Sequence, residues 1–186
     1  QAKSNLRKVY YQFIASKVQE ARLVAEEIRS NEISIDESLA TSDDFEIKKI
    51  IATQTAQLKN RQGALMNRNE IYAQKKLQYE EQINGLEAQR SSIVAQRKLV
   101  EEEKESVEQL LEKGLANKPR LNQLLRTLQD LDGRYGEVSS SIASAREAIS
   151  QVELERINLT SEYDKEVNEM LREAQIRTQT LENEYN

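Results

Sequence analysis

The sequence predicts an all-α protein: a long antiparallel coiled-coil hairpin with a third, shorter helix packed at its base. Two observations lead to this prediction. Five glycines and one proline in 186 residues leave few turns, which excludes folds with many short elements. Charged residues make up 32% and hydrophobic residues 38%. This balance fits long helices that bury narrow apolar seams better than one thick globular core.

The first expected helix spans residues 4–29, because apolar side chains recur along it at helical spacing. The stripe consists of Leu6, Val9, Tyr10, Phe13, Ile14, Val18, Ala21, Val24, Ala25 and Ile28. It is wide for a seam between two helices, so we expect this helix to lie in the groove between two others. In that position Leu6, Phe13 and Ile28 would be buried.

Residues 30–44 are predicted to be a partly extended connector, because the helical pattern stops there. Its apolar side chains, which we expect to pack onto helices, are Ile33, Ile35 and Leu39. The connector ends in a cluster of residues that favour helix N-caps, and either Asp43 or Asp44 is expected to cap the next helix.

The second expected helix spans residues 45–113, with nothing strong enough to stop it. One column of mainly apolar residues recurs every seven residues, which is the period of a coiled coil. The column consists of Ile51, Leu58, Leu65, Tyr72, Tyr79, Leu86, Ile93, Val100 and Val107. The companion columns are mostly polar, so the seam on this helix is thin.

The only strong turn signal follows, and it predicts a tip at residues 114–118. Gly114 stands where a glycine commonly ends a helix, and Asn117 can cap the next one. Pro119 suits the first turn of that helix. A third helix is therefore expected over residues 119–184, with Gly133 and Gly136 permitting close approach near the turn.

A register test supports a reversal of the chain at this tip. In a hairpin, facing residues have nearly constant sums of their numbers. Pairing Val107 with Leu124 and Ile93 with Val138 gives one such sum, and its centre falls between residues 115 and 116. That centre lies inside the predicted turn.

Composition also excludes several functions. With no histidine and no cysteine, the chain has no usual zinc site, no thiolate nucleophile and no Ser-His-Asp triad. We therefore expect no enzyme activity, metal or cofactor. The net charge of −5 argues against nucleic acid as a partner. No run approaches the ~20 apolar residues of a membrane span.

The tip is the candidate site, because it combines apolar and basic side chains at the end of a stalk. The residues expected to dock a partner are Leu111, Lys113, Gly114, Leu115, Ala116, Asn117, Lys118, Arg120, Leu121 and Leu124. The alternative is that Leu111 and Leu121 close the end of the coiled coil while the basic residues keep it soluble.

The chain resembles the α-helical hairpin of the HlyD-like membrane fusion proteins, which are periplasmic adaptors of type I secretion systems. The likeness is greatest to the branch that exports proteases and lipases. It is carried by residues 110–121 (LLEKGLANKPRL), 131–137 (LDGRYGE), 21–26 (ARLVAE), 33–35 (ISI) and 51–56 (IATQTA).

The resemblance implies an adaptor anchored in the inner membrane, with its hairpin in the periplasm. The implied partners are a TolC-like outer-membrane channel, an inner-membrane ABC transporter and further copies of the adaptor in a ring, commonly of six. Polar positions such as Gln54, Gln82, Gln89 and Gln96 would face neighbouring copies or the lumen. Because the chain begins with Gln1, we expect it to be a piece of a longer protein without the anchor.

Related drug-efflux adaptors carry the tip pattern Arg-x3-Leu-x6-Ser. Arg120 and Leu124 fit its first two positions, but Leu131 replaces the serine, which favours a secretion adaptor over an efflux adaptor. The competing hypothesis is a scaffold coiled coil with no transport role, whose long helices pair in parallel. In that case the predicted turn would be only a kink.

Overall fold

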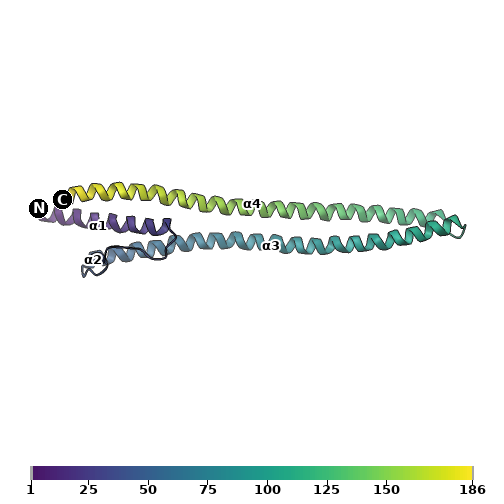
Figure 1. Cartoon of the computed structure of the whole chain (residues 1–186), viewed down its shortest axis with the longest axis horizontal. Helices are drawn as coiled ribbons and strands as arrows, with labels where there is room; N and C mark the ends of the chain where they lie inside the picture. Colours follow the sequence, from purple (N-terminus) through teal and green to yellow (C-terminus); the bar gives the residue numbers. More distant parts are fainter. Residues whose placement is uncertain (1, 186) are drawn as a thin grey trace. The chain divides into compact units, whose positions relative to one another are not determined.

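The computed structural model describes residues 2–185, and side chains from residue 5 onward. The described chain forms α1 (Ala2–Glu27), α2 (Glu37–Ala40), α3 (Phe45–Glu112) and α4 (Lys118–Tyr185), and it contains no strand. As Figure 1 shows, α3 and α4 form an antiparallel hairpin, with α1 beside them. The all-α hairpin with a third packed helix is therefore confirmed, and the parallel coiled coil is wrong.

Both ends of α3 and of α4 lie within one residue of the predicted bounds, whereas α1 begins and ends two residues earlier than predicted. Contacts group the chain into two compact units. We call Gln1–Ile71 with Arg156–Asn186 the base unit, and Tyr72–Glu155 the turn unit.

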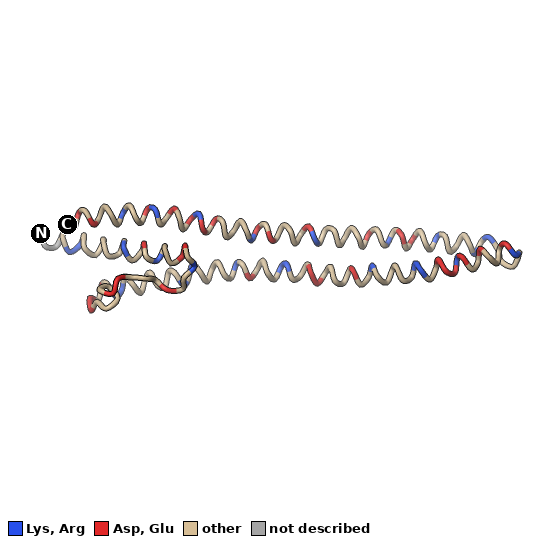
Figure 2. The backbone as a smooth tube through the Cα atoms, in the orientation of Figure 1, with Lys and Arg blue, Asp and Glu red and all other residues tan. Residues whose placement is uncertain are grey.

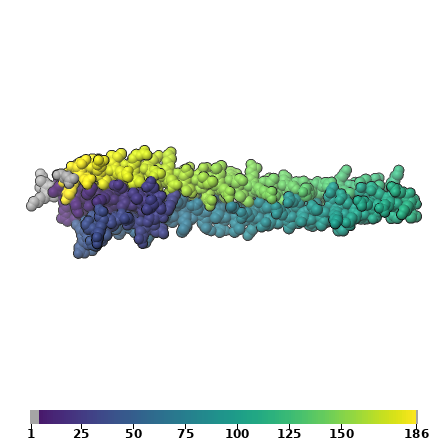
Figure 3. Space-filling view, in the orientation of Figure 1, coloured from purple at the N-terminus to yellow at the C-terminus, as the bar shows by residue number. Residues whose placement is uncertain are grey.

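In the base unit, α1 packs against both long helices. Ser16 forms a hydrogen bond with Thr178, and Arg29 forms one with Asp164. Since the residue numbers rise along α1 as they fall along α4, the two helices are antiparallel. Two apolar clusters hold the three helices together. One contains Ile14, Val18, Leu39 and Ile47, and the other contains Leu23, Val167, Leu171 and Ala174. In the space-filling view, α1 (purple) and α4 (yellow) meet side by side (Figure 3).

The face that α1 turns inward differs from the predicted one. Leu6 is 52% exposed and Ile28 is 68% exposed, so the expectation that both are buried was wrong. Phe13 packs against the first cluster but is only half-buried, so the expectation of its burial is met in part. The physical reason is that α1 buries Arg22 and Glu26 toward α3 and α4, which rotates part of the apolar stripe toward solvent.

The connector runs back along α1 and contains the short helix α2, which the sequence did not predict. Leu39 is buried and Ile35 packs against the same cluster, so both are pinned as predicted; Ile33 is half-buried. Asp44 is the cap of α3, because its Oδ1 accepts the Glu46 N–H at 2.8 Å.

Asp44 also ties the start of α3 to α1. The Tyr11 hydroxyl donates to Asp44 Oδ2 at 2.7 Å. This hydrogen bond is the main reason why the pKa of the Asp44 carboxyl lies below its usual value. The hydrogen bond therefore favours the ionised form of the carboxyl group.

In the turn unit, α3 and α4 share one narrow seam. Its core consists of Ile93, Leu131, Val138 and Ile142, with Ile83, Leu86 and Val100 packed against it. Ile93 and Val138 thus share one cluster, as the register test requires. Charged residues of both signs are scattered along both helices (Figure 2), and some pair across the seam, as Arg97 does with Asp132 at 2.7 Å.

The two glycines near the turn do not mark a close approach. A Cβ atom added at Gly133 or Gly136 would have nothing within 4 Å, so the expectation of tight packing there was wrong. Both residues lie on the exposed side of α4. Within the described chain, no helix combines the length and apolar character needed to cross a bilayer.

Candidate docking site at the turn

The turn between α3 and α4, residues 113–117, is fixed by backbone hydrogen bonds. Gly114 has φ 71°, a left-handed conformation that glycine adopts without steric cost. The Gly114 N–H donates to the Leu111 carbonyl at 3.0 Å, and the Leu115 N–H donates to the Leu110 carbonyl at 2.8 Å. These two bonds form a Schellman motif, which satisfies the last carbonyls of α3.

The start of α4 is capped as well. Asn117 Oδ1 accepts the backbone N–H of Arg120 at 3.2 Å, as an N-cap side chain does for the third residue of a helix. Pro119 stands in the first turn of α4, where its missing N–H leaves no donor unpaired. Both helix ends are therefore satisfied, and the turn presents its side chains from a defined backbone.

Two leucines form the apolar part of the site. Leu115 is 73% exposed and Leu110 is 42% exposed, and their backbones are joined by the Schellman bond. Leu110 was missed in the sequence. The available signal was its place in the capping motif. In a Schellman motif the residue after the glycine, here Leu115, commonly contacts the residue four positions before the glycine, here Leu110.

The other predicted apolar residues are less accessible. Leu111, Ala116 and Leu121 are half-buried. Leu124 is only 4% exposed and lies in the seam, where it holds the two helices together and offers no surface to a partner. The surface that remains consists of Leu110, Lys113, Leu115 and Lys118, and we call it the tip surface.

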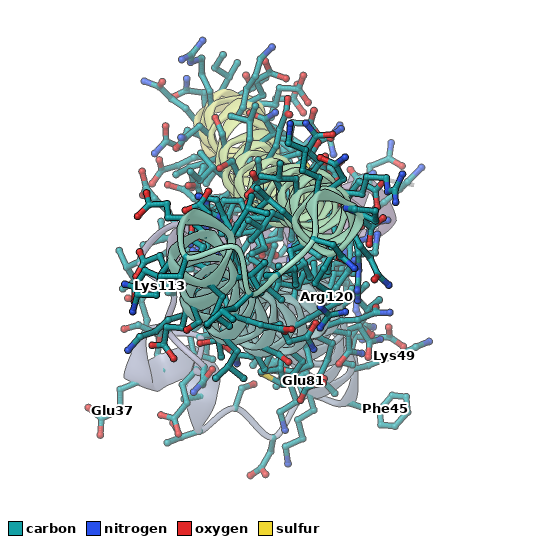
Figure 4. The ribbon with its side chains drawn as sticks, turned by 90° about the vertical axis from the view of Figure 1, so that its right-hand side faces the viewer. Glu37, Phe45, Lys49, Glu81, Lys113 and Arg120 are labelled. Carbon is teal, nitrogen blue, oxygen red and sulfur yellow. The ribbon has the colours of Figure 1, made fainter. Side chains whose placement is uncertain are left out.

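The cations around the turn fall into two groups. Lys113 and Lys118 are exposed, and neither forms an ion pair with any residue that the structure describes. Arg120 is held within the hairpin, because its guanidinium pairs with Glu103 of α3 and donates to Gln123 Oε1 at 3.2 Å. Viewed from the turn, Lys113 and Arg120 lie on opposite sides of it (Figure 4).

Nothing in the described chain suggests chemistry at this site. No group of three or more acidic side chains is arranged to hold a metal ion among the described residues. The arrangement offers two leucines and two ammonium groups that no described residue pairs with, on a turn fixed by backbone hydrogen bonds. Exposed leucines can be buried in an apolar contact, and ammonium groups attract acidic groups.

The fold defines a long α-helical hairpin domain with a third helix beside it. Residues 2–186 match the sequence profile of the family described as "AprE, long alpha-helical hairpin", and the chain belongs to this family. The match spans all the segments that carried the resemblance, and it confirms the predicted α-helical hairpin. No curated protein matches the chain at a significant level.

A solved structure has the same fold. The chain is similar to the crystal structure of the soluble domain of LipC, described as a membrane fusion protein of a type I secretion system. The TM-score is 0.93, with 22% sequence identity over 100% of this chain and 87% of that one. This similarity covers both long helices and α1.

Proposed function

We propose that this chain is the hairpin domain of a periplasmic adaptor of a type I secretion system, and that its tip surface docks on a TolC-like outer-membrane channel. Family membership supports the adaptor role. The description of LipC supports the type I system. The role is structural, with no catalytic step assigned to any residue.

The observation that carries the docking proposal is the exposure of Leu115 at a doubly capped turn. A side chain that is 73% exposed contributes little to the fold of the hairpin. Burying a leucine against a partner stabilises a complex by up to about 2 kcal/mol. Because the turn is already ordered, little conformational entropy is lost when it docks. Lys113 and Lys118 would favour a partner with acidic groups at its rim.

The remaining parts of the proposal concern the full-length protein. An inner-membrane anchor would hold it beside an ABC transporter, with the hairpin in the periplasm. Further copies would surround the export path in a ring, for which six copies is our expectation. The exposed side chains Gln82, Gln89 and Gln96 suit contact with neighbours or with water. Gln54 is engaged within the chain, where it accepts a hydrogen bond from Arg22.

Secretion by cells that carry the full-length protein tests the docking role. Leu115→Asp is expected to reduce export of the cargo strongly, because it places a charge in the apolar contact. Leu99 is 66% exposed on α3 in the same unit, so Leu99→Asp is the matched control and should secrete normally. Both variants should unfold within about 0.5 kcal/mol of wild type, as surface substitutions do. Normal secretion by Leu115→Asp would refute docking through this surface.

Arg120 needs a different design, because it already pairs with Glu103. Arg120→Glu places two carboxylates together and should impair export if the arginine also contacts the channel. The double variant Arg120→Glu/Glu103→Arg restores an ion pair within the hairpin. If the double variant recovers secretion, Arg120 acts only within the hairpin. If it does not recover, while helicity is unchanged, the arginine belongs to the docking surface.

A further inference from the structure

We infer that a buried polar network centred on Glu26 selects the register in which α1 lies along α3 and α4. The inference is independent of the secretion role. Glu26 and Arg22 are 0% and 2% exposed, although both are charged and charged side chains are almost never this buried unless paired. They lie in the part of α1 that faces the two long helices.

One carboxylate connects all three helices. Glu26 pairs with Arg22, one turn earlier on α1. Its Oε2 atom accepts Arg61 Nε of α3 at 2.8 Å and the Tyr163 hydroxyl of α4 at 2.9 Å. These hydrogen bonds can all form only when α1 has one particular position along the axes of α3 and α4.

One further contact fixes α1 at the same position along α3, and two contacts between α3 and α4 hold Arg61 in place to receive it. Arg22 Nε donates to Gln54 Oε1 of α3 at 2.7 Å. Arg61 Nη1 donates to Glu166 Oε1 of α4 at 3.3 Å. The Arg61 guanidinium carbon lies 5.3 Å from the centre of the Tyr163 ring, within the range of cation–π attraction.

The apolar contacts of α1 do not discriminate between neighbouring registers to the same extent. Apolar side chains recur about one turn apart in both sets of contacts. Val167, Leu171 and Ala174 of α4 pack with Leu23 of α1, and Ile14 and Val18 of α1 pack with Ile47 of α3. A slip of one turn, about 5.4 Å, would bring apolar groups against apolar groups again. The same slip would leave the Glu26 carboxylate buried without Arg61 and Tyr163, which is strongly unfavourable.

The network is better explained by specificity than by stability. A buried ion pair often stabilises a fold no more than apolar residues of the same size would. Arg61 Nη2 is buried without a hydrogen-bond partner among the described groups, so the network is not fully satisfied. A polar group that fixes helix register at a cost in stability is well known from coiled coils.

The selected register has a consequence at the other end of α1. The ring of Tyr185 lies 5.3 Å from that of Tyr10 and 6.3 Å from that of Phe13. A slip of one turn would break both ring contacts. Glu26 therefore sets how the first turns of α1 meet the last turn of α4.

Disulfide trapping reads the register directly, because the chain has no cysteine of its own. The hydroxyl oxygens of Ser16 and Thr178 are 2.9 Å apart, so Ser16→Cys/Thr178→Cys reports the observed register. Gln12→Cys/Thr178→Cys reports a slip of α1 by one turn toward its C-terminus. Glu20→Cys/Thr178→Cys reports a slip by one turn in the other direction.

The three reporter pairs are introduced into the parent chain and into Arg22→Met/Glu26→Leu/Arg61→Met, which replaces the charges with apolar side chains. In the parent, the crosslink yield of the pair that reports the observed register should exceed that of each slipped pair by more than about tenfold. The reason is that a slip leaves a buried charge unpaired. In the triple variant this ratio should fall toward about one. The matched control is Lys165→Met/Glu169→Leu, which removes an exposed ion pair from α4 and should behave as the parent.

Two results would overturn the inference. One is that the triple variant crosslinks only in the observed register. The other is that it keeps its helicity but crosslinks in no register, which would mean that the network supplies docking energy. If the triple variant loses helicity, Glu26→Gln/Arg61→Met is measured with the same reporters. An increase in slipped crosslinks then supports the inference, and an unchanged ratio refutes it.

Discussion

The hydroxyl group of Tyr163 donates a hydrogen bond of 2.9 Å to the carboxylate of Glu26, and this bond joins α4 to α1. Burial, and then this hydrogen bond, raise the pKa of Tyr163 to about 12. An unfolded chain has a tyrosine pKa of about 10. The folded state therefore holds this proton more tightly, and the resulting stability is complete below pH ~10 and lost as the pH rises through about 12.

Tyr163→Phe should change the pH dependence of unfolding accordingly. At pH 8 the variant should be less stable by about 1.5 kcal/mol, because it lacks a hydrogen bond to a charged group. Between pH 10 and 12 the wild type should lose more stability than the variant does, so the two curves approach each other. Urea unfolding at several pH values measures this. If the unfolding free energies of the two proteins change in parallel over that pH range, the pKa of Tyr163 is not raised by folding.

Arg29 ends α1 in a conformation that usually requires glycine. Its φ is 57°, and the Ser30 N–H donates to the Ala25 carbonyl at 2.8 Å, so it occupies the place that Gly114 takes at the end of α3. Its side chain lies over Tyr163, 4.6 Å from the ring centre, and pairs with Asp164 at 2.5 Å. These contacts offset the backbone cost.

Two substitutions at Arg29 separate the side-chain contacts from the backbone cost. Arg29→Ala loses the contacts and keeps the left-handed conformation, whereas Arg29→Gly loses the contacts and removes the strain. We expect Arg29→Ala to be less stable than Arg29→Gly by about 1 kcal/mol. Equal unfolding free energies for the two variants would mean that the backbone is not strained at this residue.

Glycine substitutions in the turn unit should have opposite signs. Gly114→Ala should destabilise the hairpin by about 1 kcal/mol, because alanine resists the left-handed conformation. Gly85 lies within α3, where an added Cβ atom would meet nothing within 4 Å. Gly85→Ala should therefore stabilise the chain by about 0.5–1 kcal/mol through higher helix propensity. Thermal unfolding of both variants checks this, and a neutral Gly114→Ala would contradict the capping role.

The attachment of α1 is tested by two substitutions on the same helix. Phe13 packs against the first cluster and stacks on Tyr185, so Phe13→Ala should cost about 2 kcal/mol, somewhat below the value for a fully buried phenylalanine. Leu6 is 52% exposed, and Leu6→Ala should change stability by less than about 0.5 kcal/mol. Denaturant unfolding gives both values. Equal losses would indicate that the described packing of α1 is incorrect.

The hairpin could be predicted from sequence because its signals are local. Gly114, Asn117 and Pro119 each have one conformational role, and together they locate the turn within a residue. The seven-residue column then aligns α3 with α4. The end of α1 was placed two residues late, because Arg29 takes a left-handed conformation that no residue type in that position announces.

The orientation of α1 could not be predicted, because an apolar stripe as wide as this one fits its groove in more than one rotation. Ile28 belongs to the stripe but points to solvent, while Arg22 and Glu26 point inward. Charged residues in a helix pattern ordinarily indicate the exposed face. The one available signal was the pair Arg22 and Glu26 at i, i+4, which flanks the apolar residues Leu23 and Ala25.

Exposed apolar residues alone do not identify a docking site. Phe45 is 74% exposed at the start of α3, and its ring points away from the helices (Figure 4). It is an isolated side chain, and isolated exposed apolar residues are common. Leu115 differs because it lies at a capped turn beside a second leucine and two lysines that pair with none of the described residues.

The most direct measurement places a photo-crosslinking amino acid at position 115 of the full-length protein during active export. We expect a crosslink from this position to an outer-membrane channel. The same amino acid at position 66, where the methionine is 69% exposed on α3, should give no such crosslink. Export without any crosslink from position 115 to a channel, or an equal crosslink from position 66, would contradict docking through the tip surface.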